Sequence, residues 1–322
     1  MILIISEAKD PTARKVHRLV HEAGHPSRWI DFNQFPARDS IRYSLAPGRP
    51  PGKSFRWNGE WIDFDTVRSI LWRRPSRVQA PTGLADAEVR DYVSTTLRET
   101  ISGVFDGLDC LQVPSAPRVS YGAHLKIPQL TLAARLGFEL PITLITNDPE
   151  EFLSFYRQHD GQLIVKPAGV YAESVLKGAM CGYARRIRPC ELVHARSVQL
   201  CPFIAQVYVD KKVEIRVMVV GSDVFAVEIH SQSTRRTLVD WRNYDEAATP
   251  HHPHELPPEI ADRCLRLVRE MGLSYGAIDL ILTPKGAYVF LEINPNGQYQ
   301  WLEEKTGLPI SERVARLLTE GK

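Results

Sequence analysis

Two apolar segments near the carboxyl end of the chain, residues 276–283 and 287–294, constrain the fold more than any other feature. A short Pro-Lys-Gly turn joins them, so they should pair as antiparallel strands. The first segment contains Asp279, and the second ends with Glu292 and Asn294. Pairing across the turn would bring two carboxylates and one amide oxygen together. Such oxygens, completed by phosphate oxygens, form a hard and open site for Mg²⁺.

The side chains of the second segment should alternate between two faces. A strict period of two places Phe290, Glu292 and Asn294 on one face and leaves Leu291 to the opposite face. A Pro-Asn-Gly turn follows directly. The alternative role for these polar groups is to cap that turn, and this alternative applies more readily to Asn294 alone than to the whole set.

Three cationic side chains occupy positions in the sequence where a bound anion would balance their charge. Lys166 lies inside the apolar sequence QLIVKP, where a lysine is costly unless its charge is paired. Lys126 opens a predicted helix. Arg216 shares one face of the strand VEIRVMVVG with Glu214, and a fixed guanidinium there could stabilise charge in phosphoryl or acyl transfer. The alternatives are lysines that extend into solvent and an ordinary ladder of ion pairs.

The first third of the chain predicts a strand, a helix and a second strand in that order. The apolar opening MILIIS is followed by an amphipathic pattern over residues 10–24 and then by SRWIDF. We expect loop or edge structure over residues 34–56, which are rich in Pro, Arg and Gly. A hairpin should turn at Asn58-Gly59, and a long amphipathic helix should occupy residues 88–108.

A chain of 322 residues is too long for one small core and suits two or three units. The sequence VPSAPRVS marks the first boundary. Helices follow it, together with strands that we expect to form mixed and antiparallel sheets. A Pro- and His-rich stretch over residues 250–259 should be a linker, and we expect no metal there because no cysteine is nearby. The pattern predicts a mixed α+β and α/β fold.

Composition excludes several classes of protein. The net charge is +2, from 40 Lys and Arg against 38 Asp and Glu, which gives no overall signal for nucleic acid or membranes. No apolar run reaches the roughly 18–20 residues of a membrane span. The five cysteines form no C-x-x-C pair, which favours reduced thiols in the cytoplasm.

The order of the candidate residues resembles that of ATP-grasp enzymes, in which two lysines, a segment such as AQVYVDKKVEIRV, an aspartate and EINPNG follow one another. Within that superfamily the chain is similar to the graspetide, or microviridin-type, peptide macrocyclases. The sequences that carry this resemblance are LWRRP, GAHLKIPQLTLAARLGFELPITLITNDPEEF, QVYVDKKVEIRVMVVG, LVDWRNY and EINPNGQYQWLEEKTGLPI. They span most of the chain from residue 70 onward. Residues 167–182 depart from the family, where we expect a plainer Gly/Ser lid.

The resemblance implies an ATP-grasp fold in three parts. These are an N-terminal pre-ATP-grasp domain over 1–113, a central lid domain over 114–200 and a C-terminal ATP-grasp domain over 201–322. The implied contacts with ATP are Lys126 and Lys166 at the phosphates, Gln206, Val207 and Tyr208 at the adenine, and Asp210 or Lys211 near the ribose. The implied positions for magnesium and for the reacting phosphate are Asp279, Glu292 and Asn294, and Arg216.

The resemblance also implies the reaction and its partners. A carboxylate of a ribosomally made precursor peptide, with a leader and an acidic core, would become an acyl phosphate at the expense of ATP. A Lys amine or a Ser/Thr hydroxyl of the same peptide would then displace phosphate and close an amide or ester crosslink. A homodimer is compatible with these expectations, and neither nucleic acid nor a membrane is an expected partner.

A local cluster of arginines is the predicted site for the acidic peptide. Arg235 and Arg236 precede Trp241 and Arg242, while the whole chain is almost neutral. The alternative is a solvated run of charge. Two further functions stay open for the whole chain: a glutamate-ligase-like enzyme that joins small amino acids or modifies peptide ends, and a nucleotide-binding module without catalysis.

Overall fold

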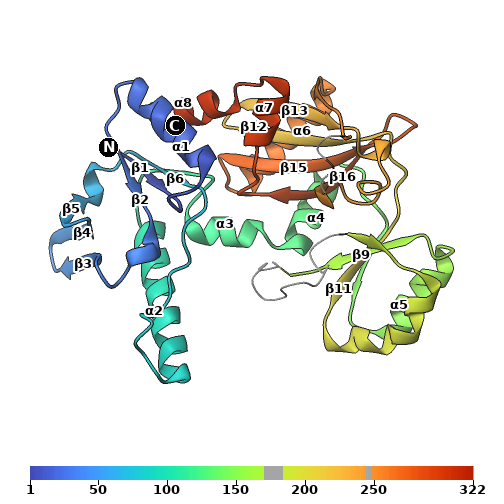
Figure 1. Cartoon of the computed structure of the whole chain (residues 1–322), viewed down its shortest axis with the longest axis horizontal. Helices are drawn as coiled ribbons and strands as arrows, with labels where there is room; N and C mark the ends of the chain where they lie inside the picture. Colours follow the sequence, from blue (N-terminus) through green and yellow to red (C-terminus); the bar gives the residue numbers. More distant parts are fainter. Residues whose placement is uncertain (170–183, 244, 246–247, 322) are drawn as a thin grey trace.

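The computed structural model describes residues 1–169, 184–243, 245 and 248–321, and the chain forms units built on separate sheets (Figure 1). Most of the predicted lid loop at 167–182 therefore lies outside the described residues. Helices and strands are mixed throughout, as predicted. No helix in the described ranges combines the length and the apolar composition that crossing a bilayer requires.

The amino-terminal unit is built on a parallel sheet with the strand order β2-β1-β6-β7. Its elements are β1 Ile2–Ile5, α1 Pro11–Glu22, β2 Ser27–Ile30, β6 Ser69–Trp72, α2 Ala87–Asp106 and β7 Leu111–Val113. All four residues of β1 are buried, which explains its continuous apolar sequence. The Asp10 side chain accepts a hydrogen bond from the Ala13 N–H at 2.9 Å and so caps α1. The predicted strand-helix-strand opening is confirmed.

A three-stranded antiparallel sheet begins in the region where the sequence predicts loop or edge structure, residues 34–56. Its strands are β3 Ser40–Ala46, β4 Arg49–Trp57 and β5 Glu60–Asp63. The edge strand β3 agrees with the second of these alternatives, whereas the central strand β4 was not predicted because Pro50 and Pro51 argue against a strand. They lie in β4 before Ser54, the first residue of β4 that pairs with β5, so the missing N–H groups break no ladder on that side. The turn at Asn58-Gly59 is confirmed, and both residues have positive φ.

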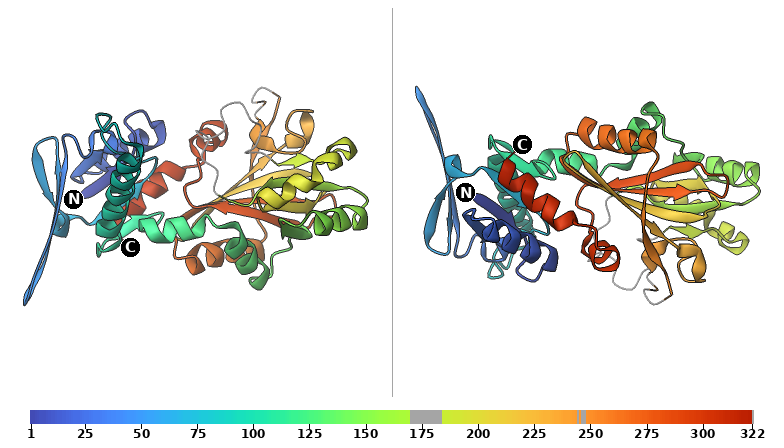
Figure 2. Two further views of the ribbon diagram at one scale, coloured as in Figure 1. Left: turned by 90° about the horizontal axis from the view of Figure 1, so that it is seen from below. Right: turned by 90° about the horizontal axis from the view of Figure 1, so that it is seen from above.

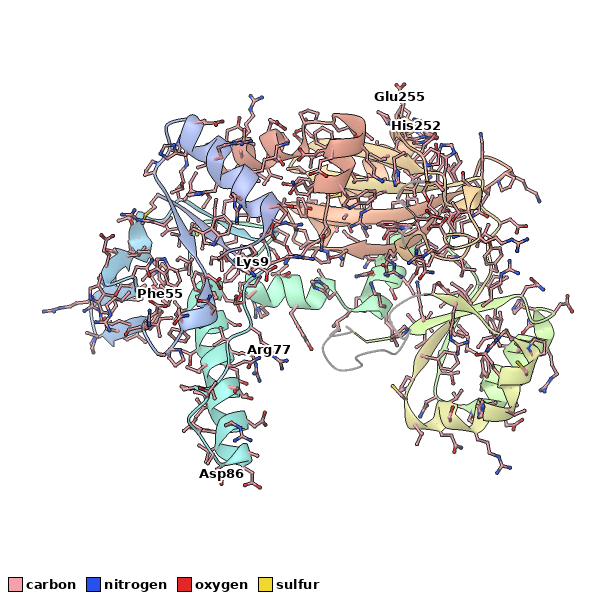
Figure 3. The ribbon with its side chains drawn as sticks, viewed as in Figure 1. Lys9, Phe55, Arg77, Asp86, His252 and Glu255 are labelled. Carbon is pink, nitrogen blue, oxygen red and sulfur yellow. The ribbon has the colours of Figure 1, made fainter. Side chains whose placement is uncertain are left out.

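Only the base of this small sheet joins the core of the amino-terminal unit. Phe55 is fully buried and packs edge-on against Phe32, with ring centroids 5.8 Å apart (Figure 3). The far end of β3 and β4 is exposed and extends away from the rest of the chain (Figure 2).

The middle of the chain carries a second, antiparallel sheet with the order β10-β9-β11-β8. Its elements are β8 Thr143–Thr146, α5 Pro149–Gln158, β9 Leu163–Pro167, β10 Arg185–Arg186, a 3-10 segment Pro189–Leu200 and β11 Phe203–Val207. A small core that includes Phe152, Leu163 and Ala205 holds the unit together. Helices α3 Pro117–Ala123 and α4 Lys126–Arg135 connect this unit to the first one.

The third unit is a five-stranded antiparallel sheet with the order β14-β13-β12-β15-β16. Its elements are β12 Val213–Val220, β13 Asp223–Ile229, β14 His251–His254, α6 Pro258–Glu270, β15 Tyr275–Leu282, β16 Tyr288–Asn294, α7 Gln300–Thr306 and α8 Ile310–Glu320. The predicted pairing of the last two strands across the Pro-Lys-Gly turn is confirmed. The first part of the stretch predicted as a Pro- and His-rich linker is instead the edge strand β14, whose residues pair with β13.

Helix α8 joins the first and third units into one core. Its residues Val314 and Leu318 pack in the same apolar cluster as Ile4 of β1 and Met218 of β12 (Figure 2). The opposite face of the five-stranded sheet carries a second cluster, which α4 and α6 cover. The carboxyl-terminal helix therefore fixes the first sheet relative to the sheet that carries Asp279 and Glu292.

Candidate active site

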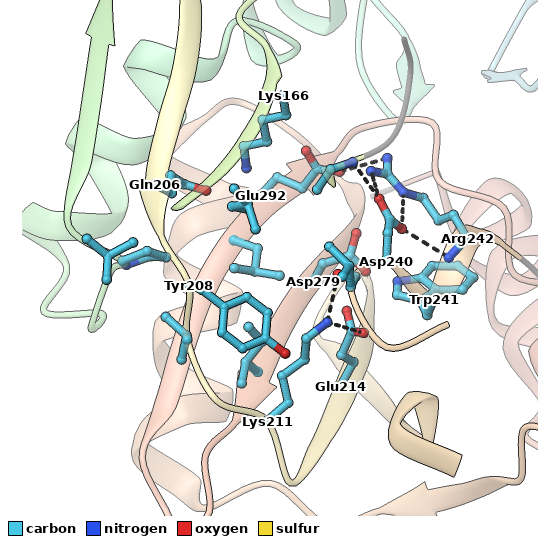
Figure 4. Close-up of a pocket in the computed structure, with 18 residues that line it drawn as sticks. Lys166, Gln206, Tyr208, Lys211, Glu214, Asp240, Trp241, Arg242, Asp279 and Glu292 are labelled. Atoms are coloured by element: carbon cyan, nitrogen blue, oxygen red, sulfur yellow. Dashed lines mark hydrogen bonds and ion pairs between the residues drawn. The ribbon is translucent and has the colours of Figure 1, made fainter. Parts of the chain in front are cut away.

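A pocket of about 600 Å³, its open mouth included, lies between the middle sheet and the five-stranded sheet (Figure 4). The charged side chains that line it are Lys166, Lys211, Glu214, Asp240, Arg242, Asp279 and Glu292. They come from β9, from the start of β12, from the segment before β14, and from β15 and β16, so the pocket exists only where the two sheets face each other.

Asp279 and Glu292 are direct cross-strand partners on β15 and β16. Both carboxylates line the pocket, as the sequence predicts for a metal site. Asn294 pairs with Ala277, and its side-chain oxygen accepts a hydrogen bond from the Asn296 N–H at 2.9 Å. In this structure the Asn294 side chain thus caps the turn, and its role as a third oxygen ligand stays a prediction.

The alternation predicted for β16 is wrong at Phe290. The register of β15 and β16 shifts after the Asp279–Glu292 pair, so that Leu280 pairs with Phe290 and Leu291 is left as the extra residue of a β-bulge. Phe290 is fully buried in the apolar cluster under α4 and α6, whereas Leu291 and Glu292 both line the pocket. A pattern of period two cannot foresee an inserted residue.

Glu292 is the centre of a cluster of cations. Lys126 lies 2.9 Å and Arg242 lies 3.6 Å from its carboxylate oxygens, and Lys166 is close enough to act on its charge. Burial disfavours the charged form, but Lys126, Lys166 and Arg242 together hold the pKa of Glu292 well below its usual range. A carboxylate in this setting stays ionised and available to a cation.

Arg216 and Asp279 form a buried ion pair beside that cluster. One guanidinium nitrogen of Arg216 donates to both carboxylate oxygens of Asp279 at 2.9 Å. Burial raises the pKa of Asp279, and the charge of Arg216 opposes this shift. The predicted common face of Glu214 and Arg216 is confirmed, because Glu214 lines the pocket and Arg216 reaches Asp279.

Lys166 lines the pocket from β9. Burial lowers the pKa of its ammonium group, and Glu292 only partly compensates. Among the described residues, no hydrogen bond or ion pair reaches the Lys166 Nζ. Lys126 begins α4, as predicted, and directs its ammonium group at Glu292. Two lysines thus face the metal-type carboxylates from two different units.

The Gln206 side chain presents an acceptor that the sequence did not reveal. The Thr143 hydroxyl donates to the Pro141 carbonyl at 2.7 Å, so its oxygen accepts from the Gln206 amide nitrogen at 2.9 Å. Among the residues that the structure describes, this leaves the buried Oε1 of Gln206 without a hydrogen-bond partner, in the wall of the pocket. The N–H groups of Val207 and Tyr208 already donate to Ile142 and Gln162, although both residues line the pocket.

The remaining predicted residues divide into those inside and those outside the pocket. Lys211 is inside, where it donates to Glu214 at 2.8 Å and to the Val239 carbonyl. Asp210 is exposed and does not line the pocket.

In the arginine-rich segment the structure separates neighbours in the sequence. Trp241 and Arg242 line the pocket, whereas Arg235 and Arg236 are exposed outside it. Arg242 also pairs with Asp240 at 2.6 Å. Its place beside the predicted Trp241 was the available sequence signal for it.

Comparison with known proteins places this geometry in context. A family model described as the RimK-like ATP-grasp domain matches residues 123–318, more than half of the chain. The structure of macrocyclase MdnC from Microcystis aeruginosa, bound with precursor peptide MdnA, is 27% identical over the full length of both chains, with a TM-score of 0.86. A RiPP-associated ATP-grasp ligase from Chryseobacterium gregarium, in complex with ADP and a leader and core peptide, is 26% identical, covers 100% of this chain and 97% of its own, and has a TM-score of 0.86.

Curated relatives match a shorter region. Ribosomal protein bS6–L-glutamate ligases from Salmonella strains are 22% identical over 193 residues, which is 60% of this chain and 62% of theirs. The chain thus spans less than two thirds of the length of these ligases.

Proposed function

Since the chain belongs to the RimK-like ATP-grasp family, we propose that it is an ATP-dependent ligase that crosslinks side chains within a ribosomal precursor peptide. The observation that carries the proposal is the Asp279–Glu292 pair, surrounded by cations in a pocket between two sheets. The whole-length likeness to MdnC supports the choice of a peptide substrate. ATP and newly made peptides meet in the cytoplasm, so we place the reaction there.

The nucleotide would lie in the pocket with its base against β11. The free Oε1 of Gln206 can accept from the amino group of adenine, whereas it would face an oxygen of guanine. Lys166 and Lys126 would hold the phosphates. Among the described residues Lys166 has no partner for its charge and Lys126 pairs only with Glu292, so a bound anion would stabilise both ammonium groups. Lys211 lines the same pocket and is proposed to lie near the ribose.

The facing carboxylates fit Mg²⁺, because the donor set is made of oxygen atoms and stays ionised. Asp279 and Glu292 would hold the ion, with Asn294 as the proposed third ligand. When bound, the ion would neutralise charge on the phosphates. In this structure Lys126 and Arg242 pair with Glu292. When the ion binds Glu292, these two cations would pair with phosphate oxygens as well.

The chemistry follows in two transfers. An acidic side chain of the peptide attacks the γ-phosphorus of ATP, ADP leaves, and an acyl phosphate forms. An amine or hydroxyl of the same peptide then attacks the acyl carbon, phosphate leaves, and one proton is released. Arg216, which is paired with the pocket residue Asp279, is proposed to neutralise charge at the reacting phosphate, and the protein otherwise orients the reactants.

We also propose three functional units, with one boundary moved. The units are the pre-ATP-grasp domain at 1–113, the lid domain and the C-terminal ATP-grasp domain. Strand β11 pairs with β8 and β9, so we extend the lid domain from residue 200 to Val207.

A second candidate is addition of an amino acid to a peptide or protein, because the curated relatives are glutamate ligases. The two reactions differ in mass. Crosslinking removes one water for each bond, whereas addition increases the mass of the substrate.

The test incubates the enzyme with ATP, Mg²⁺ and an acidic precursor peptide encoded beside its gene, followed by mass spectrometry. We expect loss of water, and we expect Glu292→Gln to reduce the rate by about 100-fold or more, as removal of a charge-stabilising group does. Glu255→Gln is the matched control, since Glu255 is an exposed carboxylate (Figure 3) that does not line the pocket. A folded Glu292→Gln variant with the wild-type rate would end the proposal.

A further inference from the structure

The turn that follows β16 has two carbonyl groups that accept hydrogen bonds from side chains far away in the sequence. Within the turn, the Asn296 N–H donates to the Asn294 side chain and the Gly297 N–H donates to the Asn294 carbonyl at 3.2 Å. The carbonyls of Asn296 and Gly297 instead accept from Arg73 at 3.1 and 3.2 Å. The Tyr275 hydroxyl also donates to the Gly297 carbonyl.

Arg73 reaches this turn from another unit. It directly follows β6 of the first sheet and lies 223 residues before Asn296 in the chain. The side chain is only 4% exposed, so its charge is buried. The Asp10 carboxylate that caps α1 lies 4.0 Å from the Arg73 Nε, and the Tyr299 ring lies 5.5 Å from the guanidinium carbon. A buried guanidinium held on several sides has a fixed position.

The turn also contacts Arg216, the arginine proposed to act at the reacting phosphate. Gly297 leaves no room for a side chain, because a Cβ atom there would lie 2.5 Å from a guanidinium nitrogen of Arg216 and would also collide with Ala277. Arg216 donates to Asp279 from its other terminal nitrogen. The backbone of Gly297 is therefore one wall of the slot that directs Arg216 at the metal-type carboxylate.

We propose that Arg73 is a positioning residue for the metal site. By holding the Asn296 and Gly297 carbonyls, it fixes the turn that places both Arg216 and the end of β16. The sequence LWRRP, which contains Arg73, thereby gains a role that neither its composition nor its place in the first unit suggests. The inference rests on the proposed function of Asp279 and Glu292 as ligands of Mg²⁺.

The experiment measures ADP affinity by calorimetry, with and without Mg²⁺, in the full-length protein. Arg73→Lys keeps the charge, but its shorter side chain does not reach the position of the one Arg73 nitrogen that donates to both carbonyls. We expect it to bind ADP alone as the wild type does. The factor by which Mg²⁺ increases ADP affinity should be about tenfold smaller than in the wild type, as in variants that misorient metal ligands. Arg74→Lys is the matched control, because Arg74 is the next residue and is exposed.

Tyr275→Phe tests the same turn by a nearly isosteric change and should reduce the magnesium gain in the same direction. An unchanged gain in both variants overturns the proposal. An equal loss of ADP affinity with and without Mg²⁺, or a lower melting temperature with a normal gain, also overturns it and leaves Arg73 a structural residue. The measurement uses no peptide, so an enzyme that modifies no peptide can still show or lack the effect, and the two proposals fail separately.

Discussion

Lys166 shows how one residue can link the fold to the ligand. Its ammonium group faces the pocket without a partner among the described residues, and burial lowers its pKa. The folded protein thus disfavours the charge that an unfolded chain accepts freely. Bound phosphates would favour the charged form and raise the pKa again.

Nucleotide affinity should therefore depend on pH through Lys166. Affinity should be strongest below the lowered pKa of the free protein and should weaken as pH rises through it. In the window between that pKa and the higher pKa of the complex, ADP binding should take up a proton. Calorimetry in buffers of different ionisation enthalpy measures this uptake.

Lys166→Met supplies the comparison. It should bind ADP more weakly, take up no proton in that window and unfold at no lower temperature, because it removes a costly buried charge. Proton uptake that persists in Lys166→Met would assign the titration to another group.

At the scale of the element, the bulge in β16 decides which side chains the strand offers to the pocket. Phe290 packs against Phe138 with ring centroids 5.3 Å apart, and Leu291 joins Glu292 at the pocket wall. A strand without the bulge would reverse these two apolar residues. The insertion lies next to the Asp279–Glu292 pair, where it separates the packed part of the strand from its functional end.

Two alanine variants should separate these roles. Phe290→Ala should lower the free energy of unfolding by about 3–5 kcal/mol, the usual cost of emptying an aromatic site in a core. Leu291→Ala should cost about 1 kcal/mol, since it is only half-buried, and should weaken ADP binding instead. Denaturant unfolding and calorimetry measure both quantities. A larger loss of stability in Leu291→Ala would contradict the observed register.

The whole molecule carries little net charge, so attraction of an acidic peptide depends on local clusters. Within the arginine-rich segment, Arg242 faces the pocket while Arg235 and Arg236 are exposed beside it in the chain. We retain the proposal that the exposed pair meets acidic side chains of the peptide. Its effect should be modest and sensitive to salt, because solvent screens exposed charges.

Arg235→Ala combined with Arg236→Ala should weaken peptide binding about three- to tenfold, as expected if each exposed pair contributes about 0.2–1 kcal/mol. The salt dependence of peptide affinity should fall, and ATP affinity should not change. Arg38→Ala with Arg49→Ala removes equal charge from exposed positions around β3 and β4, at the other end of the molecule (Figure 1). Equal peptide binding by both double variants across salt concentrations would make Arg235 and Arg236 plain surface charge.

The sequence by itself determined the features that depend on local order. Apolar strands joined by a short turn predicted that Asp279 lies beside Glu292. The position of Lys166 in an apolar strand indicated a binding site for an anion. The sequence left the proline-rich hairpin open between loop and edge structure and did not predict strand β14, because proline is compatible with a strand only where the strand edge stays open, and local order does not show which edges do.

Only the tertiary structure decided the rest. The bulge at Leu291 depends on the pairing of β15 with β16. The packing of separate sheets decides three further features: the free Oε1 of Gln206, the presence of Arg242 rather than Arg235 and Arg236 in the pocket, and the contact of Arg73 with Gly297. Distances between residues far apart in the chain are set by the fit of packed surfaces, and no periodicity within one segment encodes that fit.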